Sequence, residues 1–183
     1  MSDPADFTAI LAHWEATQPD AVALTFAGAT QTWAELAERV RRAAAGLRAA
    51  GLAPGDRIAV LDLNHPSCVE LTLACAQVGT ANAVVNFRLA PPEIAYVIND
   101  AKARLLFVGP EFGGAVEKLR AQLPAVERVI RIDGIEDEYE ACWPRTIRIR
   151  AHTPARPAIV SFSSIPRARL AFRRARCSRT AAC

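Results

Sequence analysis

Hydrophobic side chains follow two alternating spacings through the first 132 residues. Segments with apolar residues three and four positions apart predict helices, and short apolar runs bounded by turn residues predict strands. The predicted helices cover residues 7–17, 32–50, 66–79, 91–100 and 111–123. The predicted strands cover residues 21–26, 57–61, 81–85, 104–108 and 128–132. Strands that alternate with helices predict a layered α/β domain with a largely parallel sheet and right-handed crossovers.

Local signals mark where these elements begin and end. Thr32 and Glu35 form a capping box that opens the second helix, and Gly51 is expected directly after its end. Gly28 is expected in the turn after the first strand. The helical period of residues 32–50 turns the apolar side chains inward, and it predicts that the arginines face mostly outward: Arg39, Arg41, Arg42 and Arg48.

The distribution of charge divides the chain near residue 141. Residues 1–141 contain 19 Asp and Glu against 12 Lys and Arg, whereas residues 142–183 contain ten Arg and no Lys, Asp or Glu. All nine glycines lie at or before Gly134, so the basic part also lacks the usual residue of tight turns. We therefore predict an α/β domain over residues 1–141 and an irregular, Arg-rich C-terminal tail over residues 142–183.

Composition excludes several classes of protein. Half of the residues are hydrophobic and about a fifth are charged, which is too apolar for a disordered chain. No apolar run approaches the roughly 20 residues that span a bilayer. Residues 1–6 include two acidic residues and no Lys or Arg, unlike a secretory or mitochondrial targeting segment, so we expect a cytoplasmic protein.

Few polar side chains stand out as candidates for chemistry. Asn86 and Arg88 follow a predicted strand, where α/β proteins often bind ligands, although a structural role at the strand end explains them equally well. Gly113-Gly114 indicates a turn or helix entry, and the acidic run indicates a solvated loop: Glu136, Asp137, Glu138 and Glu140. The histidines are dispersed, with a surface position expected for the first and a loop for the second: His13, His65 and His152.

The cysteines show no spacing suited to zinc or to a redox pair: Cys68, Cys75, Cys142, Cys177 and Cys183. Cys68 and Cys75 lie on one face of a predicted helix, two turns apart. We expect both to be small buried hydrophobic residues in a reducing compartment.

The order of short motifs resembles the N-terminal region of adenylate-forming ligases, which include acyl-CoA synthetases, luciferases and peptide-synthetase adenylation domains. Each motif alone is weak, but together, over residues 10–132, they are specific to this superfamily. The matching segments are residues 32–36, 46–47 with Gly51, 54–60, 64–66, Gly79, 85–89 and 92–96. The resemblance implies that residues 1–141 form a partial N-terminal domain of an AMP-forming acyl-CoA synthetase.

The resemblance also implies a reaction and its ligands. In this family a carboxylate attacks the α-phosphate of ATP, pyrophosphate leaves, and a thiol, usually coenzyme A, then displaces AMP from the acyl-adenylate. The reaction uses Mg²⁺, a Ser/Thr/Gly-rich phosphate loop ending in Pro-Lys-Gly, a Tyr-Gly-x-Thr-Glu segment, a ribose-binding Asp and a late catalytic Lys. None of these motifs is present in the printed frame. We therefore assign no catalytic, cofactor-binding or metal-binding residue, and expect no ligase activity from this chain.

The tail permits a displaced reading that contains the missing loop. The last base of each codon from Phe162 to Arg179, joined to the first two bases of the next, permits Gln-Leu-Tyr-Ser-Ser-Gly-Thr-Thr-Gly-Leu-Pro-Lys-Gly-Ala-Met-Leu-Thr-His. The protein sequence fixes two bases of nearly every displaced codon, so chance agreement over 18 positions is small. Cys142 to Pro144 likewise permit Leu-Ala. We hypothesise a frameshift near Cys142, natural or introduced by sequencing.

Two other interpretations stay open at this stage. The chain could be a non-catalytic α/β binding module whose basic tail contacts nucleic acid or acidic partners. The arginines follow no helical period and accompany no recognition motif, so we expect no nucleic-acid partner. Alternatively, the fragment does not fold stably, because apolar faces that later parts of the domain would cover are left exposed.

Overall fold

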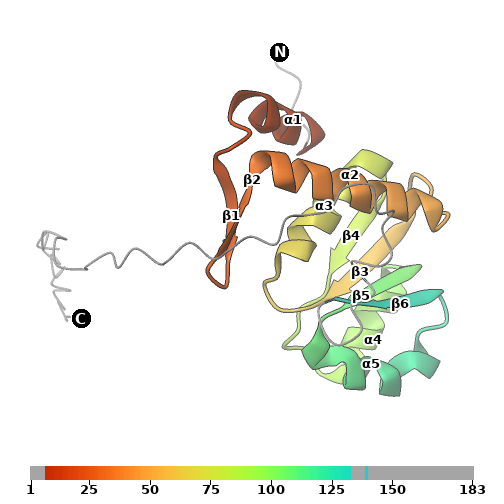
Figure 1. Cartoon of the computed structure of the whole chain (residues 1–183). Coiled ribbons are helices and arrows are strands. Elements are labelled where there is room, and N and C mark those ends of the chain that lie inside the picture. Colours follow the sequence, from red (N-terminus) through yellow and green to blue (C-terminus); the bar gives the residue numbers. More distant parts are fainter. Residues whose placement is uncertain (1–6, 133–138, 140–183) are drawn as a thin grey trace, which may run out of the picture.

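The computed structural model describes residues 7–132 and Tyr139 (Figure 1). The helices are α1 (Phe7–Thr17), α2 (Trp33–Ala49), α3 (Pro66–Val78), α4 (Pro91–Asp100) and α5 (Gly113–Leu119), with short 3-10 turns η1 (Pro110–Phe112) and η2 (Arg120–Gln122). The strands are β1 (Val22–Phe26), β2 (Ala29–Thr32), β3 (Arg57–Leu61), β4 (Ala81–Val84), β5 (Leu105–Val108) and β6 (Arg128–Arg131). The last four strands form one parallel sheet in the order β4-β3-β5-β6.

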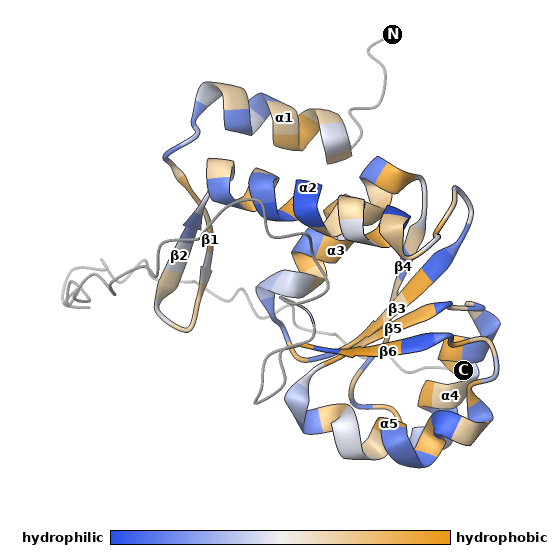
Figure 2. Cartoon of the chain, turned by 45° about the vertical axis from the view of Figure 1, so that its right-hand side comes forward, coloured by the Kyte–Doolittle hydropathy of each residue, from blue (hydrophilic) through white to orange (hydrophobic). Residues whose placement is uncertain are grey.

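Two layers of helices cover the parallel sheet. Helices α1, α2 and α3 lie on one face, and α4 and α5 lie on the other (Figure 1). Successive residues of β3 point to opposite faces, so that Ile58 and Val60 join the core under α2 and α3, whereas Ala59 and Leu61 join the core against α4 and α5. Apart from the exposed Arg57 at the start of β3, the central strands β3 and β5 are apolar, because both of their faces are covered (Figure 2). The predicted layered α/β architecture is therefore confirmed.

The capping signals read from the sequence are confirmed at α2. The Thr32 hydroxyl accepts a hydrogen bond from the Glu35 amide at 3.2 Å, and the Glu35 carboxylate accepts one from the Thr32 amide at 2.8 Å. Gly51 has a φ of 80° and follows the C-cap residue of the helix. The φ of Gly79 is also 80°, so a second left-handed residue ends α3. These positions favour glycine because a Cβ is strained there.

Strand β2, which was not predicted, pairs with β1 as an antiparallel hairpin. Phe26 pairs with Ala29 across a loop of two residues, Ala27 and Gly28, whose φ values are 49° and 82°. Two positive φ values in a two-residue loop define a type I′ turn, whose twist matches that of the flanking strands. Gly28 was correctly expected in a turn, but the four residues after it are mostly polar and were not recognised as a strand.

The predicted helix over residues 111–123 is wrong in its length. The segment divides into η1, the seven-residue helix α5 and η2. Pro110 begins the first turn, and Gly113 and Gly114 follow it, where glycine costs each position about 1 kcal/mol of helix propensity relative to alanine. Only Val116 and Leu119 of α5 are buried, so few apolar contacts oppose this local weakness. Gly113-Gly114 lies at a helix entry, as predicted.

Arginine side chains from other elements bind carbonyl groups at the ends of three helices. Arg48 donates to the Gln77 carbonyl of α3 at 2.8 Å, and Arg57 donates to the Ala101 carbonyl after α4 at 3.3 Å. Arg104 donates to the carbonyl of Gly51, after α2, at 3.0 Å. Helix C-termini present unpaired carbonyls and a partial negative charge. A guanidinium group there donates hydrogen bonds to the carbonyls and offsets the charge.

Arg104 also pairs with two carboxylates at the amino edge of the sheet. Its Nη1 lies 2.6 Å from Asp56 Oδ2, and its Nε lies 2.6 Å from Glu127 Oε1. The Asp56 carboxylate accepts a hydrogen bond from the Ala53 amide, and this bond together with Arg104 lowers the pKa of Asp56. The pKa of Glu127 is lowered by Arg104. The pKa of Arg104 is raised by Glu127 and Asp56 in return.

We expect the substitution Arg104→Met to lower the thermal unfolding midpoint at pH 7, and to do so less at pH 3. Carboxyl groups with lowered folded-state pKa values stabilise the fold above their ordinary pKa of about 4, and this stabilisation is lost as the pH falls through the folded-state values. Thermal unfolding of both proteins from pH 7 to pH 2 measures the effect. Lys118→Met, on α5, is the matched control. An equal loss at both pH values would contradict the assigned ion pairs.

Within residues 7–132, no helix is both long and apolar enough to cross a membrane.

Candidate functional site

The order of the strands creates a switch point at the carboxyl edge of the sheet. From β3 the chain passes through α3 to β4 on one side, and from β4 it passes through α4 to β5 on the other side of β3. Leu61 of β3 and Val108 of β5 are paired in register at this edge. Open α/β sheets bind ligands outside the carboxyl ends of their strands at such a point, where the connections diverge.

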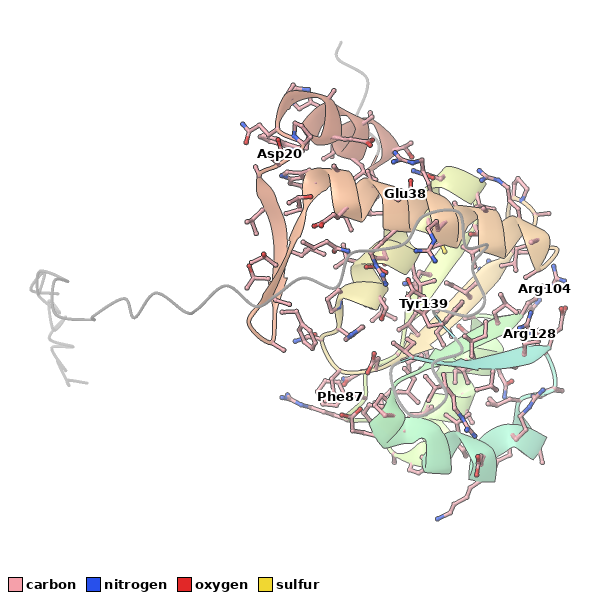
Figure 3. All side chains as sticks on the ribbon, in the orientation of Figure 1. Asp20, Glu38, Phe87, Arg104, Arg128 and Tyr139 are labelled. Carbon is pink, nitrogen blue, oxygen red and sulfur yellow. The ribbon has the colours of Figure 1, made fainter. Side chains whose placement is uncertain are left out.

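An arginine and two aromatic rings lie at this carboxyl edge. The Cζ atom of Arg88 is 5.4 Å from the centroid of the Phe87 ring. Phe87, labelled in Figure 3, packs against Phe112 of η1 with ring centroids 6.2 Å apart and an angle of 44° between the planes. Arg88 is exposed, and both rings are half-buried against the α4–α5 core. The edge therefore combines a positive charge with two aromatic rings.

Asn86 holds the turn that presents Arg88. Its Oδ1 atom accepts a hydrogen bond from the Arg88 amide at 3.0 Å, and its carbonyl accepts one from the Leu89 amide at 3.2 Å. The amide side chain mimics a backbone turn in this way. The structure confirms that Asn86 and Arg88 follow a strand, and gives Asn86 a structural role. Whether either residue contacts a ligand stays a prediction.

Asp62 and Gly109 meet where β3 and β5 end. A Cβ atom added to Gly109 would lie 1.9 Å from Oδ1 of Asp62, so any other residue would require this carboxylate to move. The φ of Gly109 is −67°, which any residue adopts, so the requirement is one of space. Oδ1 of Asp62 also accepts a hydrogen bond from the Leu63 amide at 2.7 Å. The half-buried carboxylate thus lies against the β5 backbone at the switch point.

A buried polar cluster lies on the face of the sheet that α2 and α3 cover, and it was not predicted from the sequence. Glu70 of α3 is 1% exposed, and its carboxylate accepts hydrogen bonds from the guanidinium of Arg39 at 2.5 and 3.0 Å. The Tyr139 hydroxyl donates to the same carboxylate at 2.7 Å, and the Gln31 amide donates at 3.2 Å. Tyr139 is buried between α2 and the sheet (Figure 3). The cluster fastens β2, α2, α3 and Tyr139 together.

The predicted outward orientation is wrong for Arg39 and Arg42. The Arg39 side chain is 19% exposed and turns toward Glu70, while Arg42 is 9% exposed and lies beside Arg39, Glu70 and Tyr139. The Nε atom of Arg42 has no hydrogen-bond partner among the described residues. A charged residue within the apolar run of α3, Glu70, was the signal that an inward-facing cation would be needed.

The remaining candidates have structural positions. His65 caps α3, because its Nδ1 atom accepts a hydrogen bond from the Ser67 amide at 3.2 Å. His13 is exposed on α1, as predicted. Cys75 is buried and Cys68 half-buried, and both are free thiols whose pKa values are raised, chiefly by burial. His152, the acidic run around Tyr139 and the Arg-rich tail lie outside the described residues.

The fold defines an α/β domain built on a four-stranded parallel sheet with a switch point at its carboxyl edge. The chain belongs to the AMP-binding enzyme family, whose model matches residues 11–164. The match continues past the change in composition at residue 141.

The chain is similar to several curated ligases. It is 42% identical over 124 residues to a feruloyl-CoA synthase of Amycolatopsis, a match that covers 66% of this chain and 24% of the relative. It is 41% identical over 107 residues to the fatty acid–[acyl-carrier-protein] ligase ScoC of Streptomyces coeruleorubidus, covering 58% of this chain and 21% of that protein. The chain therefore spans about a quarter of the length of these relatives.

Solved structures show the same arrangement of elements. A protein of Rhodopseudomonas palustris described as a long-chain-fatty-acid CoA ligase superposes with a TM-score of 0.70 and 28% identity, covering 76% of this chain and 36% of that one. A benzoate CoA ligase of Burkholderia xenovorans gives a TM-score of 0.65 and 25% identity, covering 85% and 30%. The resemblance to the N-terminal region of adenylate-forming ligases is thereby confirmed.

Proposed function

We propose that the described residues form the N-terminal part of an AMP-forming acid–thiol ligase. The proposed reaction joins a carboxylic acid to coenzyme A: the carboxylate attacks the α-phosphate of ATP and releases pyrophosphate, and the CoA thiol then displaces AMP. Membership of the AMP-binding enzyme family and the names of the curated relatives support this proposal. The acid stays open, because similar relatives are named for ferulate, fatty acids and 3-hydroxybenzoate.

The carboxyl edge of the sheet has the chemistry of a nucleotide-binding surface, and this observation carries the proposal. Guanidinium groups bind phosphate through charge-assisted hydrogen bonds, and aromatic faces stack on purine bases. The exposed Arg88 and the Phe87–Phe112 pair supply both groups from adjacent turns. We assign the adenine nucleotide portion of coenzyme A to this edge.

We assign no magnesium ligand among the described residues. No group of three or more His, Cys, Asp or Glu side chains in residues 7–132 and Tyr139 is arranged to hold a metal ion. The ion that would accompany ATP is therefore assigned to no residue here. A cytoplasmic location also stays a prediction from the sequence.

Binding of coenzyme A to the purified chain tests the nucleotide surface without requiring catalysis. We expect Arg88→Ala to weaken binding about tenfold, because one charge-assisted contact to phosphate contributes on the order of 1.5–3 kcal/mol, part of which solvent replaces at an exposed site. Isothermal titration calorimetry at two salt concentrations measures the affinity, and the difference between the proteins should shrink at high salt.

Arg41→Ala provides the matched control for this measurement. Arg41 is an exposed arginine of α2 that pairs with Glu15 and Glu38, on the opposite face of the sheet from Phe87. This variant should bind coenzyme A with unchanged affinity. Equal weakening by both substitutions would point to non-specific attraction of a polyanion, and the assignment of Arg88 would then be wrong.

A further inference from the structure

The two sides of the switch point carry opposite charges. Arg88 follows β4, on one side of β3, whereas Asp62 lies at the end of β3 itself, against Gly109 of the neighbouring β5. The Phe112 amide donates a hydrogen bond to the Gly109 carbonyl at 3.0 Å, so Phe112 lies one turn along the chain from Gly109. A ligand that lies along this edge therefore meets a cation toward β4 and an anion toward β3 and β5.

A carboxylate at this position selects which end of a nucleotide approaches it. Ionised aspartate only accepts hydrogen bonds, so it attracts hydroxyl and amino groups and repels phosphate. The carboxylate of Asp62 lies against Gly109, at the carboxyl ends of β3 and β5. The Leu63 amide, which donates to Oδ1 at 2.7 Å, limits its rotation.

We propose that Asp62 orients the adenine nucleotide in the site proposed above. Its carboxylate accepts a hydrogen bond from a ribose hydroxyl or from the adenine amino group, while the phosphates lie over Arg88. Asp62 and Gly109 thus act as a specificity pair: Gly109 provides the space, and Asp62 provides the acceptor. This inference rests on the proposed nucleotide surface and adds the direction in which the nucleotide lies.

Two probes separate the phosphate end of the ligand from its nucleoside end. Adenosine 3′,5′-bisphosphate carries both ends, and adenosine carries only the nucleoside. We expect Asp62→Asn to weaken binding of both probes about tenfold, because each loses a hydrogen bond to a charged acceptor. Arg88→Ala should weaken only the bisphosphate. Calorimetry for the bisphosphate and ligand-observed NMR for adenosine give the affinities, using the full-length chain.

The outcomes test separately whether the nucleotide surface exists and whether Asp62 orients the nucleotide. If the unsubstituted chain binds neither probe, the nucleotide surface itself is wrong. If it binds both, and Asp62→Asn leaves adenosine unchanged or tightens the bisphosphate, then Asp62 only repels phosphate and the orienting role is overturned. Asp62→Ser, which also removes the charge, serves as a second variant, and only variants with thermal midpoints near that of the parent are compared.

Discussion

Replacement of Glu70 by Gln is expected to lower the free energy of unfolding by about 3 kcal/mol. The side chain keeps its size, but the carboxylate that faces Arg39 loses its charge. Glu70 is 1% exposed and the Arg39 side chain 19%, so little solvent is available to replace the lost partner. Urea unfolding at pH 7, followed through tryptophan fluorescence and extrapolated linearly to zero denaturant, measures the difference.

The ion pair between Glu117 and Arg131 is the control for this substitution. Its atoms lie 2.8 Å apart, but the two side chains are 69% and 46% exposed. Glu117→Gln should therefore change the free energy of unfolding by less than about 0.5 kcal/mol, because exposed pairs are screened by solvent. Similar losses in the two variants would show that burial does not strengthen the cluster around Glu70.

Periodicity predicted the core elements because their local and tertiary preferences agree. The central strands β3 and β5 are apolar runs with buried side chains on both faces, and α2 has both a capping box and an apolar stripe. The hairpin strand β2 could not be predicted in this way. Its sequence, Ala-Thr-Gln-Thr, has no apolar alternation, and its pairing depends on the left-handed turn at Ala27-Gly28.

Of the candidate site, only the residues that follow a strand closely in the sequence could be predicted. Asn86 and Arg88 were identified because they follow a strand, and parallel strands bring their carboxyl ends to one edge. Asp62 and Gly109 are 47 residues apart, and only the pairing of β3 with β5 brings them together. The cluster of Arg39, Glu70 and Tyr139 was missed for the same reason, since its members are joined through tertiary packing of α2 and α3.

The largest change in activity that we expect depends on which reading frame is used after residue 141. The first step of the proposed reaction needs amide and hydroxyl donors around the phosphates of ATP, and removing a single preorganised donor costs about 10²–10³-fold in rate. The printed sequence from residue 142 to residue 183 contains no glycine and no lysine, whereas the codons of this segment permit a displaced reading of Ser-Ser-Gly-Thr-Thr-Gly-Leu-Pro-Lys-Gly. We therefore expect no ATP–pyrophosphate exchange from the protein in its printed frame.

Insertion of one base near codon 142 brings the displaced frame into register with residues 1–141. We expect the product of that reading to exchange pyrophosphate with ATP at least about 10³-fold faster than the printed chain, in the presence of a suitable acid, because several donors are supplied at once. The first check is the coding DNA from codon 130 onward, which must contain the bases that the displaced reading requires.

A stop codon soon after the Pro-Lys-Gly segment, or exchange activity in the printed chain, would each refute the frameshift hypothesis. The Arg-rich tail would then be a genuine part of the protein, and its partners would need to be sought among polyanions.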